Sequence, residues 1–261
     1  MKLRTVHATR YVTPLREGGS LPAIVEADDD GLYVLKFRGA GQGPKALVAE
    51  LVVGELGRAL GLPVPEIVLV ELDPELARTE PDPEIQDLIR ASAGLNLALD
   101  YLPGAIAFDP LVDKPDAALA SAVVWLDAYT TNVDRTPRNT NLLTWHRRLY
   151  LIDHGAALYF HHDWSNYTKE RARSPFALIR EHVLLPLAGA LGEADADLSA
   201  RVTPELVRGV LSSIPDGWLA AEPRFADAGE HRAAYADYLL TRLAPPRDFV
   251  EEAANARSLS V

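Results

Sequence analysis

The sequence contains no cysteine among its 261 residues. This absence excludes disulfide bonds, thiolate zinc sites and cysteine nucleophiles. Basic residues are also scarce, with 26 Lys and Arg against 37 Asp and Glu, so that the formal net charge is −11. A surface of this sign is unsuited to a long phosphate backbone, and we expect no nucleic-acid partner. An anionic ligand would need a local basic pocket.

Long apolar runs are missing as well. No stretch reaches the roughly 18 to 20 apolar residues that a membrane span needs, and the N-terminal segment has no apolar core of signal-peptide length. We therefore expect a cytoplasmic protein without membrane contact. The remaining composition is that of a globular protein, with 48% hydrophobic and 24% charged residues, and the length suits one large domain or two small lobes.

The first hundred residues carry strand patterns and helix patterns in alternation. β-branched runs bounded by polar turn residues predict strands, and apolar residues three and four positions apart predict helices. The predicted elements are, in chain order, a hairpin over 22–37, a helix over 44–60, a strand over 67–72, a short helix over 83–92 and a strand from 95 to a break at Pro103 and Gly104. The acidic segment 73–93 is predicted to be a surface excursion.

After Gly104 the sequence becomes rich in alanine and leucine. A largely apolar helix is predicted over 116–131, and it is followed by a hairpin-like segment over 141–155 and by helical patterns over 205–214 and 231–243. The change in character predicts an α+β fold of two lobes. We place a small lobe of sheet and helix at 1–98, a hinge at 99–104 and a mostly helical lobe at 105–261.

Polar residues with a defined spacing follow the apolar helix. Asp134 and Asn139 lie five positions apart, which is the spacing of the base and the metal ligand in a kinase catalytic loop, D-x-x-x-x-N. Asp153 ends an apolar strand pattern fourteen positions after Asn139. Mg²⁺ prefers hard oxygen ligands and leaves coordination sites for phosphate oxygens, so one carboxylate and one amide oxygen suffice to hold it.

A single lysine, Lys36, lies upstream in an otherwise apolar strand pattern. The chain order is strand lysine, helix glutamate, loop aspartate, loop asparagine and strand-end aspartate, which is the order found in kinases. Glu50 on the next helix is placed to pair with Lys36 and to hold its ammonium toward nucleotide phosphates, and Glu55 is the other candidate for this role. A glycine-bearing turn suited to cover phosphates contains Gly18, Gly19 and Ser20.

These residues together resemble the HipA-like kinase family, a bacterial group related in catalytic layout to phosphatidylinositol kinases. The segment ELVVGELGRALGLPVPE resembles the family's helix after the nucleotide lysine, and NVDRTPRNTN resembles its catalytic loop. The resemblance implies a two-lobed protein-kinase-like fold. It also implies transfer of the γ-phosphoryl group of Mg·ATP to a hydroxyl of a protein serine or threonine, or of a small molecule.

The same resemblance implies a role for each candidate residue. Lys36 would bind the ATP phosphates, and Glu50 would position it. Asp134 would be the catalytic aspartate, and Asn139 and Asp153 would hold Mg²⁺. The adenine base would meet the backbone of the hinge residues Asp100, Tyr101 and Leu102.

The chain departs from the usual kinase pattern around its catalytic residues. Asn-Val precedes Asp134 in place of His-Arg, so the arginine that usually reads activation-loop phosphorylation is absent. His154 stands where the DFG motif has phenylalanine. Thr136 occupies a position that is usually basic, which leaves Arg135 or Arg138 to neutralise the γ-phosphate.

Two other functions fit parts of the same residue set. A nucleotide-binding pseudokinase or scaffold module would keep the fold without turnover. A metal-dependent hydrolase would use Asp134, Asp153 and either His161 or His162, because imidazole and carboxylate are good metal ligands, and it would need neither Lys36 nor ATP. Otherwise, the two adjacent histidines are expected at the surface.

Overall fold

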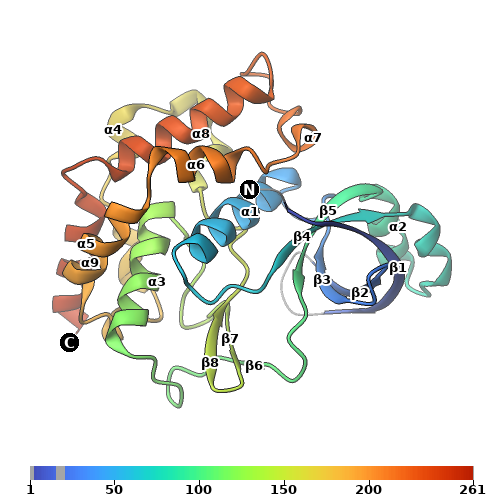
Figure 1. Ribbon diagram of the computed structural model, residues 1–261, viewed down its shortest axis with the longest axis horizontal. Helices are drawn as coiled ribbons and strands as arrows, with labels where there is room; N and C mark the ends of the chain where they lie inside the picture. The colour runs from blue at the N-terminus through green and yellow to red at the C-terminus, as the bar shows by residue number, and fades with distance from the viewer. Residues whose placement is uncertain (1–2, 16–20, 261) are drawn as a thin grey trace.

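A computed structural model describes residues 3–15 and 21–260 of the chain. It contains helices and two separate sheets, so the predicted α+β class is confirmed. The larger sheet is a closed barrel, and the smaller one has three strands and lies beside the helices (Figure 1). The predicted phosphate turn of Gly18, Gly19 and Ser20 lies outside the described residues.

The barrel is built from the N-terminal part of the chain. Its strands are β1 (Thr5–Pro14), β2 (Ala23–Ala27), β3 (Leu32–Lys36), β4 (Ile67–Leu72) and β5 (Gly94–Asp100). They follow the order β1-β2-β3-β5-β4, and a parallel pairing of β1 with β4 closes the barrel. The predicted hairpin is present as β2 and β3. Strand β1 was not predicted, because most of its second half is exposed and lacks apolar alternation.

The acidic segment after β4 is part of the barrel's hydrophobic packing. It forms a 3₁₀ helix, η1 (Pro74–Thr79), and the predicted short helix, α2 (Pro83–Ala91), which lies against the barrel in Figure 1. Ile85 and Ile89, four positions apart on one face of α2, are buried with the barrel core. The prediction of a surface excursion is therefore wrong for this face of the segment.

Helix α1 (Pro44–Ala59) is buried from residue 47 to residue 57, and this mainly apolar stretch includes the two glutamates Glu50 and Glu55. Its buried residues share one hydrophobic core with the helical part of the molecule, whereas the barrel interior forms another. A Cβ atom at Gly54 would lie 2.4 Å from Ile67 Cδ1, so any larger residue here would force the end of the Ile67 side chain in β4 to move. The helix ends at Leu60, and Gly61 continues the chain with φ +81°.

The second half of the chain is mainly helical. Its longer helices are α3 (Ala117–Thr130), α5 (Leu191–Arg201), α6 (Pro204–Leu211), α8 (Ala228–Leu243) and α9 (Asp248–Ser260). The short elements are α4 (Lys169–Ala172), α7 (Asp216–Leu219), η2 (Tyr159–His162), η3 (Trp164–Asn166), η4 (Ala177–Glu181) and η5 (Leu185–Leu187). Among the helices in the described ranges, none is long and apolar enough to cross a membrane.

All four tryptophans of the chain lie after residue 104. Trp125 and Trp164 are buried in the helical core. Trp218 is also buried, and its indole N–H donates to the Leu95 carbonyl at 3.2 Å. Trp145 is partly exposed, and it donates to the Pro103 carbonyl at 2.9 Å. Trp218 thus bonds to barrel strand β5, and Trp145 bonds to the segment that follows this strand.

The small sheet brings two distant loops together. Its strands β6 (Ile106–Ala107), β7 (Leu142–Trp145) and β8 (Arg148–Leu151) are antiparallel neighbours in that order. Leu142 at the start of β7 pairs with Leu151 at the end of β8. The loop that enters β7 and the loop that leaves β8 therefore lie at the same end of the hairpin, and these loops carry Asp134 and Asp153.

Candidate active site

Lys36 is the last residue of β3, and its side chain reaches two carboxylates from other elements. Its Nζ lies 2.6 Å from Asp153 Oδ1 and 3.9 Å from Glu50 Oε2. Glu55, the alternative partner, forms an ion pair with Arg58 at 3.1 Å. The glutamate of α1 that faces Lys36 is therefore Glu50.

Burial and charge act against each other in this triad. Burial lowers the pKa of Lys36, but the charges of Glu50 and Asp153 raise it more, so the ammonium stays charged. Burial alone would raise the pKa of Asp153, and the neighbouring Lys36 holds it below its usual value. Glu50 is 1% exposed, and burial raises its pKa to about 7 despite Lys36. Asp153 is thus the firmly ionised carboxylate of the pair.

The backbone at Asp153 is in the left-handed region, with φ 55°. A non-glycine residue held in this region costs of order 1–3 kcal/mol, and such strain is concentrated at functional sites. The chain then passes close to α1, because a Cβ atom at Gly155 would lie 3.5 Å from the Ala46 carbonyl oxygen and 3.8 Å from Glu50 Oε2. This conformation sends the Asp153 carboxylate toward Lys36.

Asp134 is held by amides of its own loop. Asn139 Nδ2 donates to Asp134 Oδ2 at 2.7 Å, and Asn141 Nδ2 donates to the same oxygen at 3.3 Å. Thr136 and Asn139 exchange backbone hydrogen bonds of 2.9 and 3.2 Å, which closes a tight turn over 136–139. The structure therefore brings the predicted aspartate and asparagine into direct contact. The carboxamide of Asn139 is exposed and the carboxylate of Asp153 is partly exposed, and both supply oxygens of the kind that Mg²⁺ takes.

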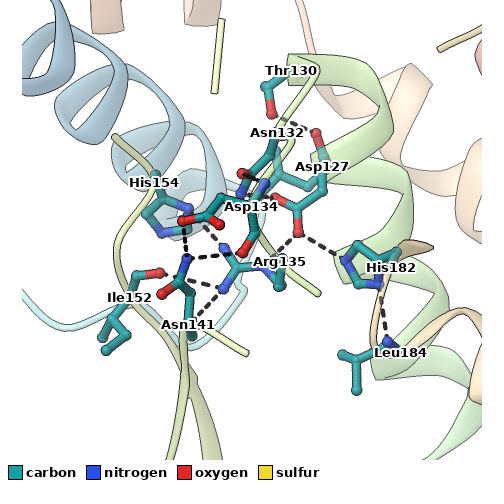
Figure 2. A network of polar contacts seen from close by, with 11 residues as sticks. Asp127, Thr130, Asn132, Asp134, Arg135, Asn141, Ile152, His154, His182 and Leu184 are labelled. Carbon is teal, nitrogen blue, oxygen red and sulfur yellow. Dashed lines mark hydrogen bonds and ion pairs between the residues drawn. The ribbon is translucent and has the colours of Figure 1, made fainter. Parts of the chain in front are cut away.

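A buried polar network lies beneath this loop (Figure 2). Its centre is the ion pair of Arg135 with Asp127 of α3, with an Nε to Oδ2 distance of 2.5 Å and both side chains fully buried. The same guanidinium donates to the Asn141 carbonyl, to the Ile152 carbonyl at 3.3 Å and to His154 Nδ1 at 3.1 Å. Arg135 is therefore committed inside the protein, and the prediction that it neutralises the γ-phosphate is wrong.

Asp127 accepts hydrogen bonds from two further side chains that lie outside α3. Asn132 Nδ2 donates to its Oδ1 at 2.9 Å, and His182 Nε2 lies 3.0 Å from Oδ2. His182 Nδ1 accepts from the backbone N–H of Leu184, so Nε2 carries the hydrogen that is donated to Asp127. Burial raises the pKa of Asp127, but the charge of Arg135 and the bond from His182 hold it well below its usual range. The carboxylate is thus ionised in the interior.

The predicted hinge begins inside β5, which continues to Asp100. The N–H of Asp100 donates to the Glu66 carbonyl at 2.8 Å, and the N–H of Tyr101 donates to the Leu32 carbonyl at 3.0 Å. The Leu102 carbonyl accepts from the N–H of Ala105 at 3.1 Å. Several backbone groups of this segment are therefore already bonded within the protein.

His161 is fully buried, so the expectation of a surface residue is wrong. Its Nδ1 lies 3.0 Å from the Tyr235 hydroxyl, in an aromatic cluster that includes Trp164 and Tyr235. Over 3–15 and 21–260, no three His, Cys, Asp or Glu side chains are grouped so that they could hold a metal ion. The metal-hydrolase alternative therefore lacks its assembled ligand set.

A protein-family model described as HipA-like kinase matches residues 9–250. The chain belongs to the HipA-like kinase family. The family resemblance of the sequence is confirmed, and with it the predicted enzyme class: this HipA-like kinase is a kinase-type phosphotransferase. No curated protein sequence matches the chain.

Solved structures of other kinases resemble this HipA-like kinase. The crystal structure of the Helicobacter pylori proinflammatory kinase CtkA matches with a TM-score of 0.56 at 12% identity, and the match covers 96% of this chain and 99% of that one. Two structures of the Golgi casein kinase, the second with Mn/ADP bound, have TM-scores of 0.47 and 0.48 at 13% identity and are covered to 75%, with 98% and 99% of this chain matched. The likeness to CtkA shows a kinase fold.

Five polar residues of this HipA-like kinase site were not predicted as parts of it. They lie beneath or beside the catalytic loop, and they are Asp127, Asn132, Asn141, His154 and His182. Two of them gave a signal in the sequence: His154 stands at the position of the DFG phenylalanine, and Asp127 is the one charged residue in the otherwise apolar helical segment 117–130. A buried charge in such a helix needs a partner, which is a reason to search for a nearby arginine.

Proposed function

We propose that this kinase transfers the γ-phosphoryl group of ATP, with Mg²⁺ as cofactor, to a hydroxyl of a protein serine or threonine or of a small molecule. The observation that carries the proposal is the contact of Lys36 with both Glu50 and Asp153, beside the loop that holds Asp134 and Asn139. These residues come from the barrel, from α1 and from both loops of the small sheet. Phosphoryl transfer depends mainly on positioning and on charge neutralisation, and this arrangement is suited to both.

Each side chain has one task in the proposed reaction. The Lys36 ammonium binds the α- and β-phosphates, and Glu50 limits its movement. Asp134 accepts the proton of the acceptor hydroxyl while the hydroxyl oxygen forms a bond to the γ-phosphorus. The bond from the γ-phosphorus to the β–γ bridging oxygen breaks, and ADP leaves with that oxygen. Asp153 and Asn139 hold Mg²⁺, which neutralises the charge of the phosphate oxygens.

Lys36 must exchange partners when the nucleotide binds. In the structure its ammonium neutralises Asp153. In the proposed complex Lys36 would turn to the phosphates, and the Asp153 carboxylate would be free to hold Mg²⁺, which would supply charge neutralisation. Each of the two side chains keeps an opposite charge beside it in this exchange, because the phosphates would replace Asp153 at the ammonium and Mg²⁺ would replace Lys36 at the carboxylate. The ion pair of 2.6 Å thus keeps both groups charged before ATP arrives.

The nucleotide base is assigned to the junction between the two proposed lobes, 1–98 and 105–261, at the hinge 99–104. The N–H groups of Asp100 and Tyr101 and the carbonyl of Leu102 already have partners, so adenine would use other backbone groups of the segment, such as the N–H of Leu102. Gly18, Gly19 and Ser20 are proposed to cover the phosphates. With Arg135 buried, Arg138 at the exposed tip of the catalytic turn becomes the candidate that meets the γ-phosphate.

Nucleotide binding and turnover test the proposal together. Purified protein is titrated with Mg·ATP, and the formation of ADP is followed beside Asp134→Ala and Asp153→Ala, with Asp197→Ala as a control for loss of a carboxylate. Asp197 lies on α5 in a surface pair with Arg201. We expect wild type and Asp197→Ala to bind ATP and make ADP, and both site variants to lose turnover. Binding of Mg·ATP without turnover would mean either that the acceptor is obligatory for ADP formation or that the chain is a pseudokinase, and absence of binding would refute the site.

A further inference from the structure

Two departures from the kinase pattern are in direct contact in the structure. Arg135 directly follows the proposed catalytic aspartate, and His154 directly follows the proposed metal ligand Asp153. The Arg135 guanidinium lies 3.1 Å from His154 Nδ1, and both side chains are buried (Figure 2). One bond therefore connects the neighbours of the two carboxylates on which the proposed reaction depends.

The Arg135 guanidinium also bonds to the backbone where the catalytic loop enters β7 and where the Asp153 segment leaves β8. It bonds to the Asn141 carbonyl at the entry to β7 and to the Ile152 carbonyl at the exit from β8. Asp127 neutralises it from α3. A planar guanidinium with acceptors on several sides keeps one orientation, because any rotation would break several of these bonds at once. Arg135 thus ties the catalytic loop and the metal-binding segment to one helix.

The hydrogen bond shows which tautomer His154 adopts. Arginine only donates, so Nδ1 accepts and Nε2 carries the hydrogen of a neutral ring. Among the described residues, Nε2 has no hydrogen-bond partner although it is buried. A phenylalanine would fill this space without an unpaired N–H, so what the imidazole adds at this position is the acceptor for Arg135.

The His154 ring also reaches α1. A Cβ atom at Gly54 would lie 3.7 Å from His154 Cδ2, one helical turn beyond Glu50. The ring therefore stands between Arg135 and the helix that carries the partner of Lys36. A single side chain contacts the structural elements that present Asp134, Asp153 and Glu50.

We propose that the Arg135–His154 hydrogen bond is a positioning device that sets the Asp153 carboxylate relative to Asp134, so that the site is assembled before nucleotide binds. The pair takes the place of the phosphorylation-reading arginine and of the movable phenylalanine that the chain lacks. Both are positioning residues, since neither is assigned a contact with the reacting atoms. The inference rests on the proposed roles of Asp134 and Asp153.

The test removes the hydrogen-bond acceptor that His154 offers to Arg135, and then restores an acceptor at the same place. In His154→Phe the acceptor is lost, and we expect kcat for ADP formation to fall about 100-fold, the cost of a displacement of about 1 Å in an active site. KM for ATP should stay within a factor of about three, because the nucleotide contacts remain. In His154→Asn the side-chain oxygen stands where Nδ1 stood, and kcat should return to within about tenfold of wild type.

His231→Phe is the matched control. His231 is also a buried histidine, with Nδ1 3.3 Å from the Leu219 carbonyl and Nε2 unpartnered within the described part of the chain. Its replacement should leave kcat unchanged, and thermal unfolding of all variants reports any loss of folding.

Three results would overturn the positioning role: an unchanged kcat in folded His154→Phe, an equal loss in His154→Phe and His154→Asn, or an equal loss in His231→Phe. In each of these the wild type still makes ADP, and the proposed function stands. A wild type that neither binds nor turns over ATP overturns the proposed function, and this inference falls with it.

Discussion

An ion-pair cluster on the surface of the barrel and the ion pair beneath the catalytic loop differ in their exposure to water. On the barrel, Arg4 bonds to Asp29 at 2.8 Å and to Glu66 at 2.9 Å, and its side chain is 50% exposed. In the helical part, Asp127 and Arg135 form their pair with no exposure at all. Water screens the first set of charges, whereas only protein groups compensate the second. The interior charges lie under the catalytic loop, where they determine the position of reactive groups as well as stability.

The largest effect is expected from breaking the interior pair. Asp127→Ala leaves Arg135 charged and buried without its carboxylate, and we expect a loss of about 3–5 kcal/mol in the free energy of unfolding. Urea denaturation followed by circular dichroism measures this loss. Asp197→Ala, which removes a carboxylate from the exposed pair with Arg201, should cost less than about 1 kcal/mol. If the two variants lost the same free energy of unfolding, the proposed difference between the buried and the exposed ion pair would be refuted.

The second largest effect is expected from acid, which should reduce the contribution of the Asp127–Arg135 pair to stability. The pKa of Asp127 is held below that of the unfolded chain, so the unfolded state takes up protons first as the pH falls. The contribution of Asp127 is therefore complete above about pH 4, the usual pKa of aspartate, and decreases as the pH falls further. Urea midpoints measured from pH 7 to pH 3 should fall, and Asp127→Asn should show a smaller decrease. An identical pH profile in the variant would contradict this assignment.

A moderate effect is expected in the apolar packing of the barrel. Ile89 of α2 is fully buried against it, and Ile89→Val should cost about 0.5–1.5 kcal/mol. Leu111→Val is a control of similar size, because Leu111 is 85% exposed, and it should change stability by less than about 0.5 kcal/mol. Thermal unfolding of both variants measures the difference. If Ile89→Val behaves like the control, segment 73–93 does not belong to the barrel core.

The smallest effect should come from the exposed charges of the barrel. Arg4→Ala removes the pairs with Asp29 and Glu66, and we expect a loss of at most about 1 kcal/mol that shrinks further in high salt. Unfolding in urea at low and high ionic strength tests both statements. A loss as large as that of Asp127→Ala would show that exposure does not separate the two groups of charges.

Local patterns were sufficient to predict about half of the elements in the described ranges, and helices α5, α7 and α9 were missed. The predicted hairpin, α1, β4, α2 and β5 all have apolar spacing that agrees with their burial. Strand β1 is mostly exposed beyond its first residues, so its sequence carries no periodic signal. Ile85 and Ile89 were too few to show that an acidic segment packs on the barrel.

The site was predictable where residue type and chain order carried the information. Lys36, Glu50 and Asp153 are far apart in the sequence, yet their order matched a known arrangement, and the structure brings them into contact. The partners of Arg135 could not be predicted, because three of them are backbone carbonyls or a ring nitrogen positioned by tertiary folding. His161 was misjudged because its burial depends on Tyr235, 74 positions away.

The placement of the tryptophans allows their fluorescence to report on the contact between the barrel and the helical part. The indole of Trp145 is bonded to the carbonyl of Pro103, in the stretch that follows β5, and the indole of Trp218 is bonded to the carbonyl of Leu95, in β5 itself. Trp125 and Trp164 are enclosed in the helical core and serve as an internal reference. Single replacements of Trp145 and Trp218 by phenylalanine would therefore separate emission that follows movement at the junction from emission that follows only the integrity of the core.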